Sequence, residues 1–307
     1  MKRIYFNLFL LLLFMTGNSV LAQKQSKKEN GKQPKDFFIS TYQFHPHLLK
    51  KNAWLIDFST EIPKFYKYYN PKLGKIAPKM PVVVLNEAYF NAHFLYGLNA
   101  NLNLYVNLPF KDFHHYSPMM FQKGVGFGDL QTGVVYGNLL GEPHHLTLEA
   151  QINWPTGIYK HDMQTLNTGT GAFGFQVGLN GLENLQPNKH DAWEFAYHAY
   201  YNYLVSTDNI DKGMETGATA LFRKPFHTHY GYFGLENAFN FQYHSPYKAG
   251  QKTLPNTELT QFDVSIGGWY QFLNNFYLRL SVPYTLYQNQ AYLTKYSVVI
   301  QLDYKFN

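Results

Sequence analysis

Strict alternation of residue character at the carboxyl-terminal end of the chain constrains its fold more than any other feature. Between Leu293 and Phe306 a mostly apolar set of residues alternates with a mostly polar set. The first set is Thr294, Tyr296, Val298, Ile300, Leu302, Tyr304 and Phe306, and the second is Lys295, Ser297, Val299, Gln301, Asp303 and Lys305. Because successive side chains of a β-strand point to opposite faces, the segment predicts a two-faced strand. Such a strand suits a soluble sandwich edge or the wall of a transmembrane barrel.

The same alternation recurs along the chain and predicts about twelve strands, in a range of roughly ten to fourteen. The expected strands are Ala53–Ile62, Val84–Tyr96, Asn99–Leu108, Gly128–Asn138, His145–Trp154, Ala172–Leu182, Ala192–Val205, Gly213–Arg223, Tyr230–Tyr243, Leu259–Phe272, Asn275–Tyr287 and Leu293–Phe306. An even number is expected of a single-chain bacterial barrel. The predicted fold class is therefore all-β, an antiparallel up-and-down transmembrane barrel closed by its last strand.

The lengths of the predicted connections alternate. If the first strand starts on the periplasmic side, odd-numbered connections are extracellular and long, and even-numbered ones are periplasmic and short. The first set includes Pro63–Val83, Pro109–Val125 and Pro155–Gly171, whereas the second includes the pairs Gly97-Leu98 and Leu273-Asn274. An immunoglobulin-like sandwich gives no reason for such an alternation. The connection lengths therefore favour the barrel.

The amino-terminal 22 residues predict a secretory signal peptide. Lys2 and Arg3 provide its positive start, Leu8–Met15 its apolar core, and the sequence Val20-Leu21-Ala22 a small-residue cleavage site. No apolar run of the chain reaches the roughly 18 residues of a spanning helix. The chain also lacks cysteine. An exported, cysteine-free chain of this kind indicates the bacterial envelope, and a transmembrane barrel indicates the outer membrane of the bacterial cell.

The positive charge of the chain is concentrated before the predicted barrel. The whole chain has a formal charge of +6, but from Phe37 onward 19 Lys and Arg residues face 18 Asp and Glu residues. Residues 23–36 are polar and predict a disordered periplasmic leader, and the barrel is expected over residues 37–307. Within that range, Phe37–Lys51 reads either as an extra strand or as a segment that enters the lumen. The charge balance gives no support for a nucleic-acid partner.

Charged residues of the predicted strands fall on the polar parity. Since lipid cannot hydrate a charge, this parity is expected to face the lumen. The lumen-facing candidates are Asp57, Glu61, Glu87, Asp129, Glu149, Glu194, Glu236, Asp263, Arg279 and Asp303. Two interpretations stay open: these groups line a water-filled pathway, or they pair across the interior and only hold the barrel shut.

Three motifs in the middle of the chain resemble those of a known family. The sequence GFGDL at Gly126–Leu130 is followed by PTG at Pro155–Gly157 and by LNTGTGAFGF at Leu166–Phe175. This pattern resembles the outer-membrane transporter family named after the phenol meta-degradation pathway. The resemblance implies a β-barrel transporter of hydrophobic or aromatic compounds, with motif residues at Gly126, Gly128, Asp129, Pro155, Thr156, Gly157, Thr168 and Gly169. Those residues suit either a bend in the wall or direct contact with substrate.

Other constellations give weaker indications. The histidine pairs His45/His47, His114-His115, His144-His145 and His227/His229 occur at different ends of the predicted barrel and have no carboxylate at ligand spacing, so no metal site or other cofactor is expected. The only adjacent His–Ser pair, His244-Ser245, has no assignable third partner for nucleophilic catalysis. The sequence therefore does not predict an enzyme.

The function expected from the sequence is passive transport of small hydrophobic or aromatic molecules. The alternatives are a structural or adhesive surface protein without transport and a lipid-modifying barrel enzyme. The expected partners are the solute, outer-membrane lipids, the barrel-assembly machinery, which would read Tyr304 and Phe306, and lipopolysaccharide, which would meet the lysines of the first long connection. A monomer is expected.

Overall fold

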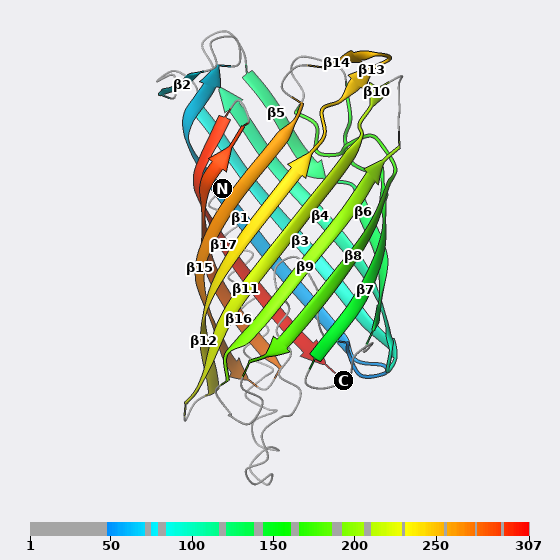
Figure 1. Ribbon diagram of the computed structural model, residues 1–307, viewed down its shortest axis with the longest axis vertical. Coiled ribbons are helices and arrows are strands. Elements are labelled where there is room, and N and C mark those ends of the chain that lie inside the picture. Colours follow the sequence, from blue (N-terminus) through cyan, green and yellow to red (C-terminus); the bar gives the residue numbers. More distant parts are fainter. Residues whose placement is uncertain are drawn as a thin grey trace. The chain divides into compact units, whose positions relative to one another are not determined.

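The fold consists of β-strands in the computed structural model of the chain (Figure 1). The structure describes residues 48–70, 75–78, 84–116, 121–137, 144–160, 166–185, 192–205, 210–228, 231–254, 257–273, 275–289 and 292–306. The predicted signal peptide, the predicted leader and residues 37–47 lie outside these ranges. Over the ranges just given, no helix has the length and apolar character to cross a membrane.

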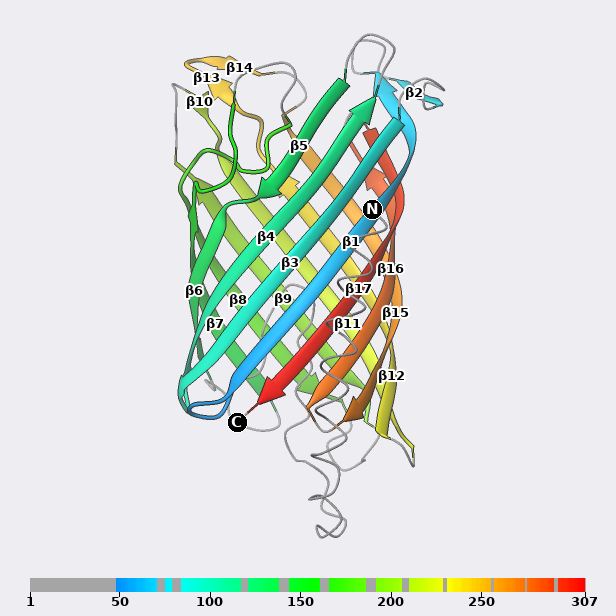
Figure 2. The same cartoon turned by 180° about the vertical axis from the view of Figure 1, so that it is seen from behind.

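Twelve of the described strands form a closed antiparallel barrel. They are β1 (Trp54–Asn70), β3 (Val84–Asn99), β4 (Leu102–Tyr116), β6 (Leu130–Gly137), β7 (His144–Trp154), β8 (Gly174–Asn184), β9 (Glu194–Leu204), β11 (Met214–Thr228), β12 (Gly231–His244), β15 (Leu259–Leu273), β16 (Phe276–Gln288) and β17 (Tyr292–Phe306). Each corresponds to one strand predicted from the alternation, so the predicted fold class is confirmed. Figure 2 shows β1 and β17 side by side, where Trp54 pairs with Phe306 and the barrel closes as expected.

The strands at one end of the barrel extend further than predicted. The predictions of connections over Pro63–Val83 and Pro109–Val125 are wrong in part, because β1 continues to Asn70 and β4 to Tyr116. Two further strands extend the wall, β2 (Lys75–Pro78) beside β1 and β5 (Phe121–Phe127) beside β4. Pro63 does not end β1, because the pairing with β3 stops at Glu61 whereas the ladder with β17 continues through Pro63.

A small separate sheet lies in the connections at the same end. It consists of β10 (Ile210–Asp211), β13 (Lys248–Ala249) and β14 (Lys252–Thr253), which the alternation does not predict. We call this end of the barrel the long-connection end, and the opposite end the short-connection end. The bounds of the barrel strands confirm the predicted alternation of connection length for most connections; the exception is residues 289–291 between β16 and β17, a short connection at the long-connection end.

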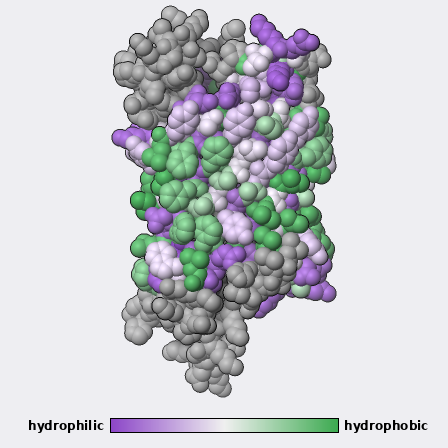
Figure 3. Space-filling view, viewed as in Figure 1, coloured by the Kyte–Doolittle hydropathy of each residue, from purple (hydrophilic) through white to green (hydrophobic). Residues whose placement is uncertain are grey.

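The barrel has an apolar outer face and a polar interior, the reverse of a soluble protein. Figure 3 shows apolar side chains across the middle of one outer face. Along β16, Leu280 is 52% exposed whereas its neighbour Ser281 is 6% exposed and points inward. The same alternation holds on β17, where Ile300 is exposed and Gln301 is buried. In a membrane, lipid solvates such an outer face, so its exposure carries no penalty.

Side chains fill the interior toward the short-connection end. Leu182, Ala196, Leu221 and Ala238 form one buried apolar row across β8, β9, β11 and β12. Arg223, which is fully buried, pairs with Glu194, and Arg279 pairs with Glu236. We call these eight residues the packed layer. On the outside of the same end, Trp54 packs against Tyr96 and Phe306, with ring centroids 4.6 and 6.4 Å apart.

Candidate functional site

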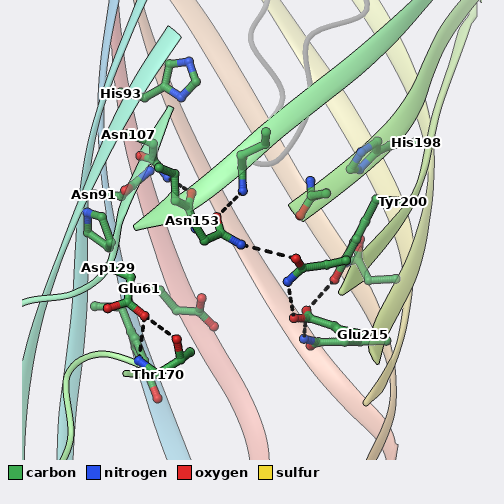
Figure 4. A pocket seen from close by; sticks show the side chains of 18 of the residues that line it. Glu61, Asn91, His93, Asn107, Asp129, Asn153, Thr170, His198, Tyr200 and Glu215 are labelled. Atoms are coloured by element: carbon green, nitrogen blue, oxygen red, sulfur yellow. Dashed lines mark hydrogen bonds between the residues drawn. The ribbon is translucent and has the colours of Figure 1, made fainter. Parts of the chain in front are cut away.

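A cavity of about 600 Å³ lies inside the barrel and extends toward the long-connection end (Figure 4). Its lining includes residues from eleven of the twelve barrel strands, all except β17 among the residues that the structure describes. The cavity is thus formed by nearly the whole circumference of the barrel wall. Its position follows from the alternation, which sends the polar parity of each strand inward.

The lining of the cavity is rich in amides and carboxylates. Of its described residues, ten are Asn or Gln, and six are acids: Asp57, Glu61, Asp129, Glu149, Glu215 and Asp263. The basic side chains are one lysine, Lys111, and three histidines. Four tyrosines, Tyr89, Tyr105, Tyr200 and Tyr247, add aromatic surface that ends in a hydroxyl. The cavity can therefore hydrogen-bond a solute and also pack against an aromatic or apolar part of it.

Hydrogen bonds join the lining residues into a chain that starts at Glu149. The hydroxyl of Tyr105 lies 2.6 Å from Glu149 Oε1 and 2.8 Å from Gln151 Oε1. Asn180 donates to the other oxygen of Glu149 at 3.2 Å. Gln151 in turn donates to Asn153 Oδ1 at 2.6 Å. Four strands, β4, β7, β8 and β9, are connected by such bonds, because Asn153 also donates to Asn202 at 3.4 Å.

The chain of hydrogen bonds ends at Glu215, which lies on β11. Its carboxylate accepts from the hydroxyl of Tyr200 at 2.8 Å, from Asn202 at 3.4 Å and from Gln242 at 2.7 Å (Figure 4). All these donors are neutral. Glu149 and Glu215 are therefore held in place by side chains from neighbouring strands that do not cancel their charge.

The three family-like motifs meet at one point of the wall, beside the cavity. Asp129 lies between β5 and β6, which follow one another along β4. Its carboxylate accepts from Gly157 N at 3.0 Å and from Thr170 N and Thr170 Oγ1, both at 2.6 Å. One carboxylate thus ties the connection between β7 and β8 to the break between β5 and β6. We call this group of hydrogen bonds the Asp129 latch.

Two threonines extend the latch. Thr168 donates its hydroxyl to Phe127 O at 2.7 Å and accepts from Ile158 N at 3.0 Å. The hydroxyl of Thr156 accepts from Leu130 N at 2.8 Å. The motif threonines therefore replace the ladder hydrogen bonds that the chain loses where β5 gives way to β6.

The motif glycines allow the two segments to approach closely. A Cβ atom on Gly157 would lie 2.6 Å from Gly169 Cα, and one on Gly169 would lie 2.7 Å from Gly157 Cα. No side chain fits at such a distance, so the pair requires glycine at both positions. These contacts give the motif residues a structural role in the bend of the wall.

Lys212 fixes the same connection from the other side. This residue is buried, its ammonium group contacts Thr170 O, and it lies 4.1 Å from the centroid of the Tyr159 ring. Burial, together with the charges of Tyr159 and Glu215, raises the pKa of Tyr247 in the next connection. Tyr247 therefore remains a neutral hydroxyl at neutral pH. The long-connection end of the cavity is thus partly covered by ordered connections.

The structure separates the predicted lumen-facing residues into two groups. Asp57, Glu61, Asp129, Glu149 and Asp263 line the cavity. Glu194, Glu236 and Arg279 belong to the packed layer, and Asp303 accepts from Gln301 at 2.8 Å beside it. Glu87 stands apart near the long-connection end, where it accepts from the hydroxyl of Tyr89 at 2.7 Å.

Several residues of the site are absent from the sequence-based candidates. Glu215 and Arg223 share a parity on β11 and could have been found by extending the charge rule to that strand. Lys111 and Tyr200 follow from no local signal, since β4 extends past its predicted end and tyrosine suits either face of a barrel. Which side chains meet across strands depends on register, and alternation alone does not give it.

The histidines form no metal centre within the described ranges, where no group of three or more His, Cys, Asp or Glu side chains could hold a metal ion. The expectation that no carboxylate accompanies the pair His114-His115 is wrong. His114 lies 2.8 Å from Asp112, two residues earlier on the same face of β4, and His115 lies 2.6 Å from Glu87 on β3. Each contact joins one histidine to one carboxylate. His45 and His47 lie outside the described residues.

The adjacent His244-Ser245 pair is not arranged for nucleophilic catalysis. The ring Nδ1 of His244 lies 2.6 Å from the backbone oxygen of Ser245, whereas the hydroxyl of Ser245 accepts from Met214 N at 2.8 Å. A general base must contact the hydroxyl of its nucleophile. Ser245 therefore positions the start of β11.

Comparison with known proteins shows a likeness in fold. No family model matches the chain, and no curated protein matches its sequence. Among solved structures, an outer membrane channel from Pseudomonas putida F1 superposes with a TM-score of 0.70 at 13% identity, over 88% of this chain and 100% of that chain. The translocator domain of the autotransporter NalP from Neisseria meningitidis gives 0.46 at 9% identity, over 98% of both chains. The CymD monoaromatic hydrocarbon channel gives 0.38 at 10% identity, over 84% of this chain and 88% of that chain. The chain therefore shares the barrel fold of the outer membrane channel from Pseudomonas putida F1.

Proposed function

We propose that the protein is a passive channel of the bacterial outer membrane for small molecules. The observation that carries the proposal is the cavity of about 600 Å³, which is lined from eleven strands and enclosed by a barrel with an apolar outer face. A barrel that only anchored a surface structure would have no need of a hollow, hydrogen-bonding interior.

The apolar outer face supports a location in a membrane. A closed barrel leaves no strand edge unpaired, so its backbone can lie in lipid without unsatisfied N–H and C=O groups. The aromatic group of Trp54, Tyr96 and Phe306 at the short-connection end suits the interface between lipid and water. The predicted export signal adds support from the sequence.

The lining favours a small aromatic or amphipathic solute. Tyr89, Tyr105 and Tyr200 offer rings against which an aromatic solute can stack. The ten amide side chains require a solute, or the water around it, that can satisfy hydrogen bonds. The family resemblance of the three motifs points to the same class of aromatic compounds.

The packed layer would be the constriction of the pathway. The row Leu182, Ala196, Leu221 and Ala238 and the two arginine–glutamate pairs occupy the interior toward the short-connection end. Passage to that end requires these side chains to move. We therefore expect a low conductance with brief openings in place of a constantly open pore.

Conductance in planar bilayers tests the proposed function. The purified protein should give discrete current steps, and the steps or their frequency should increase in Leu221→Ala, which removes bulk from the packed layer. Leu280→Ala, which shortens a side chain on the outer face, serves as the matched control and should behave as the unmodified protein. A barrel that carries no current in any of these forms, and no flux of small solutes into liposomes, would favour the structural or adhesive alternative.

The expected partners fit the same proposal. Lys64 lies on β1 toward the long-connection end, where it could meet the phosphates of lipopolysaccharide; the backbone positions of Lys67 and Lys75 fall on β1 and β2, and Lys72 and Lys79 lie outside the described residues. The barrel-assembly machinery would read Tyr304 and Phe306 on β17. Because β1 and β17 close the barrel, the twelve barrel strands leave no edge among themselves to recruit a second copy, which supports a monomer.

A further inference from the structure

The charges on the cavity wall are unbalanced. Six carboxylates and one lysine line the cavity among the described residues, and with neutral histidines this gives a formal charge of −5. The barrel as a whole shows no such excess, since from Phe37 onward 19 basic residues face 18 acidic ones. The negative charge is therefore concentrated inside, where a solute would pass.

The packed layer, in contrast, is built from matched pairs. Glu194 is paired with Arg223 and Glu236 with Arg279, so each acid there has a cation in contact. Over the part of the chain that the structure describes, Glu149 and Glu215 accept hydrogen bonds from neutral tyrosine, asparagine and glutamine side chains. The ring nitrogen Nε2 of His198 lies 4.0 Å from Glu149 Oε2. Among the described residues, the acids of the packed layer are thus paired with arginine, whereas Glu149 and Glu215 of the cavity wall are held by tyrosine and amide side chains.

The hydrogen bonds also hold these two carboxyl groups in position. Tyrosine and amide side chains contact each of them at distances of 2.6 to 3.4 Å. Their donors come from β4, β8, β9 and β12, which fixes the carboxylates on the wall.

We propose that the cavity selects small molecules that carry a positive charge, and that Glu149 and Glu215 set this selectivity. The inference rests on the proposed channel function and names its class of solute. Glu149 and Glu215 stand at the two ends of the hydrogen-bonded chain through Gln151, Asn153 and Asn202, so the field extends along the wall instead of marking one tight site. A cation is attracted along its path without being trapped.

The aromatic surface of the cavity fits the same solute class. Tyr105 and Tyr200 lie beside the two carboxylates and hydrogen-bond to them directly. A cation over an aromatic ring gains additional attraction from the ring electrons. An aromatic ammonium ion would thus find a carboxylate for its charge and a ring for its apolar part at both positions.

The ratio of potassium to chloride permeability tests the inference. In planar bilayers with a potassium chloride gradient at about 0.1 M, where the Debye length is about 10 Å, the unmodified channel should favour potassium. A unit charge about 4 Å from an ion changes its energy in water by about 1 kcal/mol, which corresponds to roughly a fivefold change in occupancy. The double variant Glu149→Gln/Glu215→Gln should therefore lower the permeability ratio at least severalfold while it keeps the size of both side chains.

Two further variants sharpen the test. Lys111→Gln removes the one lysine of the described lining and should raise the permeability ratio, a change opposite in sign. Glu258→Gln removes an exposed acid outside the cavity and should leave the ratio unchanged. Heat-modifiable migration on gels should be the same for all variants, which shows that each barrel has folded.

Matched organic probes extend the test to solutes. Benzylammonium should enter liposomes through the channel faster than benzoate, and the double variant should reduce that difference. A channel that conducts but prefers chloride, or whose permeability ratio is unchanged in the double variant, would overturn the inference and leave the proposed function standing. A barrel that conducts neither ion and passes neither probe would overturn both.

Discussion

The Asp129 latch gives the most quantitative prediction from this structure. Asp129 is 8% exposed and accepts three hydrogen bonds, from the backbone N–H groups of Gly157 and Thr170 and from the Thr170 hydroxyl. A hydrogen bond to a charged group contributes about 1.5 to 3 kcal/mol. Since water can replace part of this once the connection lifts away, Asp129→Ala should weaken the latch by about 3 kcal/mol, or about a hundredfold in the population of the open connection.

Limited proteolysis measures that population. Lys160 lies in the connection between β7 and β8 and is exposed, but its N–H is bonded to Asn167 Oδ1 at 2.7 Å, which holds the segment in a fixed conformation. If opening is fast relative to cleavage, the rate of tryptic cleavage follows the population of the open form. Cleavage after Lys160 should therefore become about a hundred times faster in Asp129→Ala.

Two comparisons make the result interpretable. Asp129→Asn keeps the shape but places an amide nitrogen where N–H donors now point, so it should also accelerate cleavage. Glu258→Gln, which lies in a different connection, should be cleaved after Lys160 at the same rate as the unmodified protein. If Asp129→Ala is folded and is cleaved no faster than the unmodified protein, the latch does not hold the connection and the reasoning is refuted.

Further predictions concern the two faces of the wall and the packed layer. Leu280→Arg should impair membrane assembly much more than Ser281→Arg, because a lipid-facing arginine costs about 2 to 4 kcal/mol near the bilayer midplane; equal yields of folded barrel would show that the inside and outside faces are wrongly assigned. Arg223→Met leaves Glu194 without its cation and should lower stability by about 3 to 5 kcal/mol, as measured by urea unfolding in detergent, whereas Arg223→Met/Glu194→Gln should recover most of the loss. A double variant no more stable than Arg223→Met would mean that the pair is not the cause.

The sequence was sufficient to predict the barrel because one rule of residue placement applies to all the strands of the wall. Each strand must place apolar residues toward lipid and polar residues inward, so Leu280 and Ser281 reveal their faces without knowledge of their neighbours. A bend was also predicted at Gly126 and Gly128, directly before Asp129, although the sequence did not predict β5 itself.

The contents of the lumen could not be predicted in the same way. Contacts such as that of Glu149 with Tyr105 join residues 44 positions apart and depend on the register of several strands. Alternation places both residues inside but does not say that they meet. This register separates the cavity, which extends toward the long-connection end, from the arginine–glutamate pairs near the short-connection end. It also brings Asp129 into contact with the connection between β7 and β8.

Accessibility of single cysteines tests most directly the claim that the cavity is the path of the solute. The chain has no cysteine, so each introduced thiol is unique. Gln176 and Val177 are neighbours on β8; Gln176 lines the cavity, whereas Val177 is 59% exposed on the outer face. A charged, thiol-reactive methanethiosulfonate reagent should reduce the single-channel current of Gln176→Cys and leave that of Val177→Cys unchanged. An unchanged current in Gln176→Cys after complete modification, or an equal reduction in both variants, would contradict the account.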